Sequence, residues 1–579
     1  MFNKYNAKMK QTIFLLYISI SFLVIACKTS PKTVPYTVTQ SLIADTAMVV
    51  AAHPLASQAG IEILRQGGNA IDAAIATQFA LAVVYPRAGN LGGGGFMVIR
   101  TKDGAVDALD YREKAPLAAH RDMYLDSLGN PVAEWSQAGH LSVGVPGTVA
   151  GMVAAHQKYG KIKNFADLLV PAYRLALEGF AVSETEADRL NTARDDFKKY
   201  NENAAPFVKN EPWATADLLV QKDLATTLKR IQDQGHKGFY EGATAQQIVA
   251  EMQRGKGLIT MEDLAKYQAI WRKPIVGEFK NFRIITMPPP SSGGIALMQM
   301  LNILEDYPLN AEGFQSPDAI HLIVETMRRV YADRAEYLGD SDFWPVPTDS
   351  LLDEGYLAMR MADFNMDRAT VSDTVVAGKF TLATESFETT HTSVVDGEGN
   401  AVSVTTTLNL NYGSKVIVQG AGFILNDEMD DFSAKPGTPN YFGLIGNEAN
   451  AIAPEKRMLS SMTPTIAEKD GELFLVLGTP GGSTIITSVL QVFLNVAEYD
   501  MDVDDAVNAY RFHHQWLPDE VWYEKGGMDS VLLNNLANRG HHWVEKDYLG
   551  KVKAIHALGN GQLHGAGDRR NPDDDAEGY

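Results

Sequence analysis

Two runs rich in β-branched residues flank one short turn late in the chain. Residues 389–395 read Thr-Thr-His-Thr-Ser-Val-Val and residues 401–409 read Ala-Val-Ser-Val-Thr-Thr-Thr-Leu-Asn, with Asp-Gly-Glu-Gly-Asn between them. β-Branched side chains are stiff and fit a pleated surface, so they favour strands. Because Asp-Gly is typical of a tight turn between strands, the pattern predicts a β-hairpin over residues 389–409.

A helical period dominates other parts of the chain. Asn69 stands where it can cap an Ala-rich helix over residues 70–84. Asp318 can cap another helix, whose apolar positions share one face: Ile320, Ile323, Met327 and Val330. The region 160–275 is predicted to be mostly helical, with four leucines as core candidates: Leu168, Leu169, Leu175 and Leu177. Residues 340–388 are rich in Asp and Thr and are predicted to be irregular.

Two glycine-rich turns interrupt these periodic stretches. Residues 89–95 lead into an apolar strand, whereas phosphate-binding glycine loops lead into a helix, so a tight turn is the better interpretation. Residues 478–483 read Gly-Thr-Pro-Gly-Gly-Ser and separate a buried strand at 473–477 from a helix. Two glycine N–H groups at a helix N-terminus form a place for negative charge.

Composition indicates a large folded protein. The chain has 579 residues, of which 45% are hydrophobic and 21% are charged, so it can bury a sizeable core. Lys and Arg number 51 against 71 Asp and Glu, which gives a net charge of −20. That sign excludes a nucleic-acid-binding role that depends on neutralising phosphates.

The first 27 residues have the pattern of a secretion signal. Basic residues precede an apolar run over residues 13–26, which is short for a membrane span, and the run ends at Cys27. The sequence before Cys27 resembles a bacterial lipobox, and Cys27 is the only cysteine of the chain. We expect residues 1–26 to be a lipoprotein signal peptide, with Cys27 lipidated and residues 27–41 a tether. The protein is then expected in the bacterial cell envelope, periplasmic and lipid-anchored to a membrane; an ordinary signal peptide that contains a cysteine is the alternative.

Several common catalytic devices are missing from the sequence. It contains no G-x-S-x-G motif, no H-E-x-x-H motif and no cysteine cluster. His513 and His514 could ligate a metal, but adjacent residues on a strand point to opposite faces, so a structural role is favoured. Two interpretations of Thr389 remain: it is simply a strand residue, or it becomes a chain terminus that carries a nucleophile.

Long motifs in the same order carry a family resemblance. They lie at 111–116, 288–294, 389–391, 426–435, 460–464, 478–483 and 511–516, and include Tyr-Arg-Glu at 111–113 and Ser-Ser-Met-Thr-Pro at 460–464. In these stretches the chain resembles the γ-glutamyltransferases, also called glutathione hydrolases, which are N-terminal-nucleophile hydrolases. The similarity covers nearly everything from about residue 42 to the C-terminus.

The resemblance implies an α+β fold, a four-layer αββα sandwich. It also implies a self-processing precursor (a zymogen) that is cut between Glu388 and Thr389. The large subunit would cover 42–388 and the small, catalytic subunit 389–579, and the two would stay together as a heterodimer. No metal or organic cofactor is implied. A long segment at 436–453 matches the family's lid loop.

For catalysis, the resemblance places the nucleophile at Thr389. A threonine hydroxyl needs an adjacent base, and the terminal amine of the same residue can serve, with a reference pKa of roughly 7.7–8.0. Cleavage would therefore create nucleophile and base together. Thr407 would orient Thr389, and Gly481 and Gly482 would donate backbone N–H groups to the oxyanion.

For substrate binding, the resemblance implies a γ-glutamyl group with a free carboxylate and a free ammonium. Arg112 would bind the carboxylate, because its planar guanidinium suits bidentate pairing. Ser460 and Ser461 would assist Arg112. Three further residues would hold the ammonium: Asn409, Glu428 and Asp431. Glutathione is the expected small-molecule substrate, and water or an amino acid or peptide is the acceptor.

Two alternatives stay open at this point. A cephalosporin or glutaryl acylase of the same fold would take an acyl group without the ammonium, which would leave Asp431 as an unpaired buried charge. A non-catalytic, lipid-anchored binding protein would need neither the cut nor the nucleophile.

Overall fold

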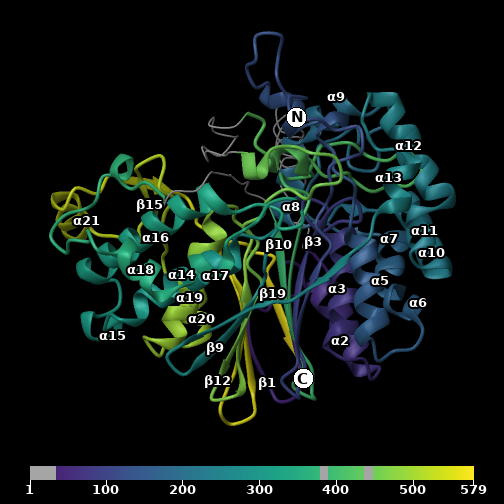
Figure 1. Ribbon diagram of the computed structural model, residues 1–579. Coiled ribbons are helices and arrows are strands. Elements are labelled where there is room, and N and C mark those ends of the chain that lie inside the picture. The colour runs from purple at the N-terminus through teal and green to yellow at the C-terminus, as the bar shows by residue number, and fades with distance from the viewer. Residues whose placement is uncertain (1–33, 378–388, 436–447) are drawn as a thin grey trace, which may run out of the picture.

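The computed structural model describes residues 34–377, 389–435 and 448–579 (Figure 1). The predicted signal peptide, Cys27, Glu388 and most of the expected lid loop at 436–453 lie outside these residues. Tyr36 Oη donates a hydrogen bond to Ala181 O (3.1 Å), and Thr39 N donates one to Asp575 Oδ1 (2.8 Å). Contacts with the folded body therefore begin before residue 42.

Two seven-stranded sheets form the centre of the molecule, and neighbouring strands within each pair antiparallel. The hairpin sheet has the order β19 (Asp575–Gly578), β2 (Met48–Ala51), β10 (Thr390–Val395), β11 (Ala401–Thr407), β3 (Gly94–Arg100), β4 (Val106–Asp110) and β7 (Ile270–Arg272). The second sheet has the order β1 (Ser41–Ala44), β18 (Leu563–Gly567), β17 (Lys553–Ala557), β13 (Glu472–Gly478), β12 (Thr465–Lys469), β9 (Phe282–Thr286) and β8 (Ile275–Phe279).

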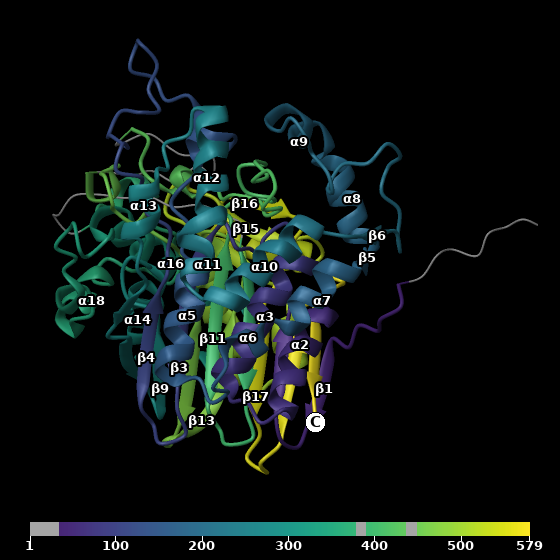
Figure 2. The same ribbon diagram turned by 90° about the vertical axis from the view of Figure 1, so that its right-hand side faces the viewer.

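Both sheets are buried on both faces, as alternating side chains show. In β2, Val49 and Ala51 face the helices, whereas Met48 and Val50 pack between the sheets. Three helices pack on the outer face of the hairpin sheet: α2 (Pro54–Arg65), α3 (Ala70–Val84) and α5 (Thr148–Tyr159). Behind them, α7 (Val170–Glu178) packs on α3, and α10 (Lys222–Gln234) packs on α7. Others cover the second sheet: α14 (Gly293–Glu305), α16 (Pro317–Tyr337), α19 (Thr484–Ala497) and α20 (Val503–Asn508). Figures 1 and 2 show these layers, so the expected αββα sandwich is confirmed.

The predicted hairpin is confirmed as β10 and β11 at the centre of its sheet. Thr390 pairs with Thr406 and Val395 with Ala401, and every residue of both strands is buried. In the turn, Asp396 Oδ1 accepts hydrogen bonds from the backbone N–H groups of Glu398 (2.9 Å) and Asn400 (3.0 Å). The other carboxylate oxygen of Asp396 accepts from Ala70 N (2.9 Å), which joins the turn to the start of α3.

Shorter elements complete the described chain. The remaining helices are α4 (Ala133–Gln137), α6 (Phe165–Leu168), α8 (Glu184–Thr192), α9 (Arg194–Tyr200), α11 (Lys237–Tyr240), α12 (Gly242–Gly255), α13 (Met261–Lys266), α15 (Leu309–Glu312), α17 (Thr348–Leu351), α18 (Glu354–Arg360) and α21 (Ser530–Asn538). The 3₁₀ turns are η1 (His140–Ser142), η2 (Ser372–Thr374), η3 (Glu428–Asp431) and η4 (Glu448–Asn450). The remaining strands are β5 (Phe180–Ala181), β6 (Leu218–Leu219), β14 (Phe512–His514), β15 (Val521–Glu524) and β16 (Trp543–Lys546).

Local sequence signals succeeded in some places and failed in others. Asn69 caps α3 through a capping box, as predicted. The cap of α16 is Ser316 rather than Asp318, because the Ser316 hydroxyl accepts from Ala319 N (3.1 Å) and Pro317 begins the helix. Leu177 is 43% exposed and is not a core residue. The short helices α17 and α18 lie in the stretch that was predicted to be irregular.

Candidate active site

The hairpin places Thr389 and Thr407 opposite each other. Thr389 immediately precedes β10, and the register that pairs Thr390 with Thr406 sets Thr407 across from it. Thr389 is 7% exposed, and its hydroxyl oxygen is buried without a hydrogen-bond partner among the described residues. The Thr407 hydroxyl accepts a hydrogen bond from Asn409 N (2.7 Å). Before cleavage, the Thr389 hydroxyl therefore makes no hydrogen bond to the Thr407 hydroxyl. The role of Thr407 in orienting Thr389 stays a prediction.

The glycine turn before α19 lies beside Thr389. Thr389 and Gly481 line one pocket, together with Pro480 and Gly550. Gly481 (φ +143°) and Gly482 (φ +56°) have backbone angles that a side chain would strain, and a Cβ on Gly481 would lie 2.6 Å from Thr484 Oγ1. Among the described residues, no other backbone group accepts a hydrogen bond from either N–H. Both N–H groups thus lack a backbone acceptor in the described part of the chain, and Gly481 lines the same pocket as Thr389.

Arg112 lies just past the end of β4 and is completely buried. Its backbone N–H donates to Asp110 Oδ1 (2.9 Å), which fixes the turn out of the strand. The guanidinium donates to the carbonyl oxygens of Met458 (3.4 Å) and Leu459 (3.2 Å) and forms ion pairs with Glu428 and Asp431. The family resemblance assigns Arg112, Glu428 and Asp431 to binding the same substrate. In the structure, Arg112 is in direct contact with both acids.

Three acidic side chains surround Arg112. Glu113, Glu428 and Asp431 are all buried there, and Glu113 Oε2 lies 3.6 Å from Arg112 Nη1. Burial raises the pKa of Asp431 to about 6 and that of Glu113 to about 8, and it raises the pKa of Glu428 well above its usual range. Glu113 and Glu428 therefore hold protons near neutral pH, and a further cation bound beside them would favour their charged forms.

Two asparagines hold the acidic turn η3 in place. The side chain of Asn426 donates to the carbonyl oxygens of Gly92 (2.7 Å) and Gly144 (2.8 Å) and accepts from Glu428 N (3.0 Å). Asn409 has a positive φ of +76° and donates from Nδ2 to Asp427 O (3.1 Å). Since Asn409 N also bonds Thr407, this residue links the hairpin end to the acidic turn.

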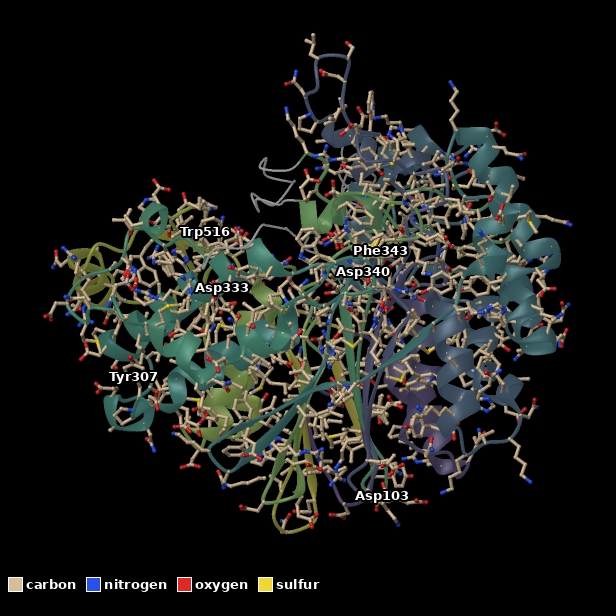
Figure 3. All side chains as sticks on the ribbon, in the orientation of Figure 1. Asp103, Tyr307, Asp333, Asp340, Phe343 and Trp516 are labelled. Carbon is tan, nitrogen blue, oxygen red and sulfur yellow. The ribbon has the colours of Figure 1, made fainter. Side chains whose placement is uncertain are left out.

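Ser460 and Ser461 lie on the segment that Arg112 contacts. Ser460 N donates to Pro290 O (2.9 Å), and Ser292 N donates to Ser460 O (2.7 Å). Asp340, labelled near the centre of Figure 3, accepts from Arg457 N (2.8 Å) and fixes the start of this segment. Ser460 and Ser461 thus follow directly after the two carbonyl groups that Arg112 contacts, and their role at the substrate stays a prediction.

Sequence reasoning missed Arg334 of α16. This buried arginine donates to Ser292 Oγ (3.0 Å) and Ser461 Oγ (3.3 Å), and its charge lowers the pKa of Asp431. It stands on the apolar-patterned face of a long helix, where the sequence pattern predicts core packing. Its only sequence signal is a charge on that buried face.

The histidines do not form a convincing metal centre. His513 and His514 are buried and have different partners, with His513 Nδ1 at 2.9 Å from Thr487 Oγ1 and His514 Nδ1 accepting from Trp516 N (3.0 Å). Within the described chain one group has metal-like spacing: His321, Glu325 and His541. The Glu325 carboxylate already pairs with Arg328 (3.2 Å) and Arg329 (2.7 Å), so this group is better explained as an ion-pair network.

Comparisons with known proteins indicate one family over most of the chain. Residues 56–578 match the family model described as Gamma-glutamyltranspeptidase. A glutathione hydrolase proenzyme of Escherichia coli (strain K12) is 47% identical over 534 residues, which cover 92% of each chain. The solved Helicobacter pylori gamma-glutamyltranspeptidase is 46% identical with a TM-score of 0.56, covering 59% of this chain and 97% of that one. A cephalosporin acylase from Bacillus halodurans is 26% identical with a TM-score of 0.83, covering 95% of this chain and 99% of that one.

Proposed function

The chain belongs to the gamma-glutamyltranspeptidase family, and from this premise we propose that Thr389 is the nucleophile of a self-processing γ-glutamyltransferase. The protein is a γ-glutamyltransferase and glutathione hydrolase, which transfers the γ-glutamyl group to water or to an amine. The proposal concerns which residues do this. Its main support is the buried Thr389 hydroxyl, which has no hydrogen-bond partner in the described chain and shares a pocket with Gly481.

Processing would create the catalytic pair at one residue. Cleavage of the bond between Glu388 and Thr389 releases a Thr389 amine, which takes the hydroxyl proton as the oxygen attacks the γ-carbonyl carbon. The backbone N–H groups of Gly481 and Gly482 stabilise the resulting oxyanion, and each such donor contributes about 2.7–4 kcal/mol. Collapse expels the leaving amine, which takes the proton, and leaves a γ-glutamyl-Thr389 ester.

The ester is resolved by the reverse sequence. Water or an acceptor amine attacks the ester carbonyl and gives a proton to the Thr389 amine. The carbon–oxygen bond to Thr389 breaks, and that proton returns to the hydroxyl. Transfer and hydrolysis thus differ only in the attacking group, and neither step requires a metal or organic cofactor.

The charge cluster is proposed to select the γ-glutamyl group. Arg112, with Ser460 and Ser461, would bind the α-carboxylate, and the carboxyl groups of Glu428 and Asp431 would bind the α-ammonium beside Asn409, which would favour their charged forms. Arg112 pairs with both acids in this structure. On binding, the substrate carboxylate would replace part of the pairing at Arg112, and the substrate ammonium would replace part of the pairing at the acids.

A glutaryl acylase is the second candidate, since the acylase from Bacillus halodurans shares the fold. A glutaryl group lacks the ammonium, so it would leave the acidic cluster with only its arginines as counter-charges. Comparing γ-glutamyl and glutaryl anilides separates the two: preference for the glutaryl compound would contradict the present assignment.

The chain boundaries remain part of the proposal. We expect a large subunit that ends at Glu388 and a small subunit that starts at Thr389, held together because β10 and β11 are central strands of a sheet whose other strands come from both. Cys27 is proposed as the site of lipidation after removal of residues 1–26, which would anchor the protein at the cell envelope. Among the described residues, no helix has both the length and the apolar character to cross a bilayer.

Mass spectrometry of the purified protein tests the mechanism. Wild type should give two fragments, the smaller beginning at Thr389, whereas Thr389→Ala should stay one chain. The variant should lose γ-glutamyl-p-nitroanilide hydrolysis by at least about 10⁴-fold, because it lacks the nucleophile. Thr390→Ala, which changes the neighbouring buried threonine, is the matched control and should still be cut. An uncut but active wild type would rule out Thr389 as a terminal nucleophile.

A further inference from the structure

One face of helix α16, labelled in Figure 1, contacts two separate parts of the candidate site. Tyr331 and Arg334 stand three residues apart on this helix, so their side chains leave the same face, about 4.5 Å apart along its axis. Each of the two residues is only 1% exposed. The Arg334 guanidinium lies 5.9 Å from the centre of the Tyr331 ring, so the side chains are neighbours. Contacts that fix this helix therefore fix both side chains.

Tyr331 reaches the glycine turn that carries the proposed oxyanion donors. Its hydroxyl donates a hydrogen bond to the backbone carbonyl oxygen of Ser483, the residue that directly follows Gly481 and Gly482. The Tyr331 ring also lies edge-on to the His513 ring, with the centroids 5.5 Å apart. Two consecutive glycines give a turn wide backbone freedom, so its shape depends on contacts from neighbouring elements. The phenol supplies such a contact one residue after the glycine pair.

Arg334 reaches the serine segment, residues 458–461, which contacts Arg112. The Arg334 guanidinium donates to Ser461 Oγ (3.3 Å) and to Ser292 Oγ (3.0 Å). Ser292 in turn donates to the Ser460 carbonyl oxygen from its N–H (2.7 Å) and from its hydroxyl (2.9 Å). Arg334 thus holds Ser461 directly and Ser460 through one intermediate residue.

Contacts of Asp333 keep α16 from turning about its axis. Asp333, labelled in Figure 3, accepts a hydrogen bond from Gln299 of α14 (3.3 Å) and pairs with Arg360 of α18 (3.1 Å). A packed helix is a more precise support than a loop, because neighbouring side chains lock its position. The helix therefore presents Tyr331 and Arg334 at a fixed spacing.

A γ-glutamyl group requires a fixed spacing between its two binding points. Three carbon atoms separate its α-carboxylate from the carbonyl carbon that reacts, whereas a β-aspartyl group has two carbon atoms in that place. In the proposed function the carboxylate binds at the serine segment and the developing oxyanion binds at the glycine turn. A misplacement of about 1 Å can cost a reaction about 10²-fold in rate. The distance between the segment and the turn therefore decides which acyl length reacts.

We propose that Tyr331 and Arg334 are positioning residues that set the distance between the glycine turn and the serine segment, and so select the length of the γ-glutamyl group. The inference rests on the proposed function, in which the glycine turn stabilises the oxyanion and Ser460 and Ser461 bind the α-carboxylate. Tyr331 acts on the transition state, because the oxyanion forms only there. Arg334 acts on binding, because the carboxylate is bound before the reaction as well as during it.

The test measures catalysis and binding separately. The kcat is measured with γ-glutamyl-p-nitroanilide, and binding is measured as the inhibition constant of glutamate, the product that water forms from the γ-glutamyl group. Tyr331→Phe should lower kcat about tenfold and leave the inhibition constant within about twofold. Arg334→Gln should raise the inhibition constant about tenfold and change kcat by less than about threefold. Arg334→Lys keeps the charge but loses the forked geometry, so it should lie between wild type and Gln.

A comparison of acyl lengths and two control variants exclude a merely structural effect. Tyr331→Phe and Arg334→Gln should each lower the preference for γ-glutamyl- over β-aspartyl-p-nitroanilide about threefold, because a loosened site admits the shorter acyl group.

The controls are two other buried positions of α16. Arg329→Gln removes an arginine that pairs with Glu325 (2.7 Å) and Asp363 (2.7 Å), outside the site. Thr326→Val removes a hydroxyl whose hydrogen bond to Leu322 O (2.9 Å) stays within the helix. Both controls should keep kcat, the inhibition constant and the acyl preference within about twofold.

All constants refer to the amount of protein that is cut before Thr389, so a processing defect is not counted as a kinetic one. If Arg334→Gln yields no cut protein, Tyr331→Phe and Arg334→Lys carry the test. Variants that change kcat and binding in the same proportion, or that keep the acyl preference of wild type, would overturn the assignment. A wild type that is not cut or does not hydrolyse the anilide would instead contradict the proposed function.

Discussion

The two sides of Thr389 use charge in opposite ways. On the Arg112 side, an arginine and three carboxylates are buried together and pair with one another. On the Lys551 side, Arg189 and Lys551 are half-exposed and share a pocket with no acidic residue in its described lining. The charged groups of the first region are buried and pair with one another, whereas the cations of the second are partly exposed to solvent.

The difference in burial sets the difference in strength. Removing one partner of a buried pair leaves an uncompensated charge, whereas exposed pairs contribute little and are screened by salt. We therefore expect the Arg112 side to decide whether a γ-glutamyl group binds at all.

The largest effect should come from Arg112. Arg112→Gln removes a cation that pairs with both Glu428 and Asp431, and breaking a buried pair costs about 3–5 kcal/mol. We expect kcat/KM for γ-glutamyl-p-nitroanilide to fall about 10²–10³-fold. Arg112→Lys keeps the charge but loses the forked geometry, so it should lie between wild type and Gln. A Gln variant with wild-type kinetics and normal processing would remove Arg112 from the substrate site.

A smaller effect is expected from Asp431→Asn. Loss of this charge near a buried ammonium should lower kcat/KM about 10²-fold, with a smaller loss for a glutaryl anilide, which lacks the ammonium. An equal loss of kcat/KM for both anilides would show that Asp431 does not bind the ammonium.

The same variant has a pH signature. Burial raises the pKa of Asp431 to about 6, so the carboxylate is charged above that pH and should bind the ammonium only there. Wild-type kcat/KM should rise through about pH 6 and again as the Thr389 amine loses its proton, at roughly 7.7–8.0. The Asn variant should lose the lower step and keep the upper one.

The smallest effect concerns salt. Raising ionic strength from about 0.01 to 0.5 M should change kcat/KM for a γ-glutamyl dipeptide with a free C-terminal carboxylate by about two- to threefold, because partly exposed charges such as Arg189 are screened over a Debye length of a few to tens of ångströms. Hydrolysis of the uncharged-leaving-group anilide should change less, since the charges at Arg112 are buried. Equal salt sensitivity of both substrates would erase the proposed contrast between the two sides.

Much of the secondary structure followed from local patterns. The β-branched runs around residues 396–400 predicted the hairpin, and Asn69 predicted the start of α3, because both are short-range effects of side-chain shape and capping. Local reasoning failed at Asp318, where Ser316 and Pro317 two positions earlier begin the helix. It also failed at Leu177, since a leucine at helical spacing can still face solvent.

The site residues were found through the order of long motifs rather than through geometry. The family resemblance assigns Arg112 to one end of the substrate and Glu428 and Asp431 to the other. It does not predict the direct contact of Arg112 with the two acids, which are more than 300 positions away from it in the chain. The role of Arg334 and the pocket that Thr389 shares with Arg87, Arg189 and Lys551 were not predicted. Neither is marked by a sequence motif. Arg334 is a charge on the buried face of a helix, and the pocket combines residues from α8, the segment after α3 and the loop before β17.

The sequence by itself determined the hairpin, the glycine turns and the family to which the chain belongs. These depend on backbone preferences and on runs of residues that are adjacent in the chain. The tertiary structure alone decided which charges meet and which face solvent. The strength of a charge depends on its distance from other charges and on its burial, and folding sets both quantities among residues that are hundreds of positions apart.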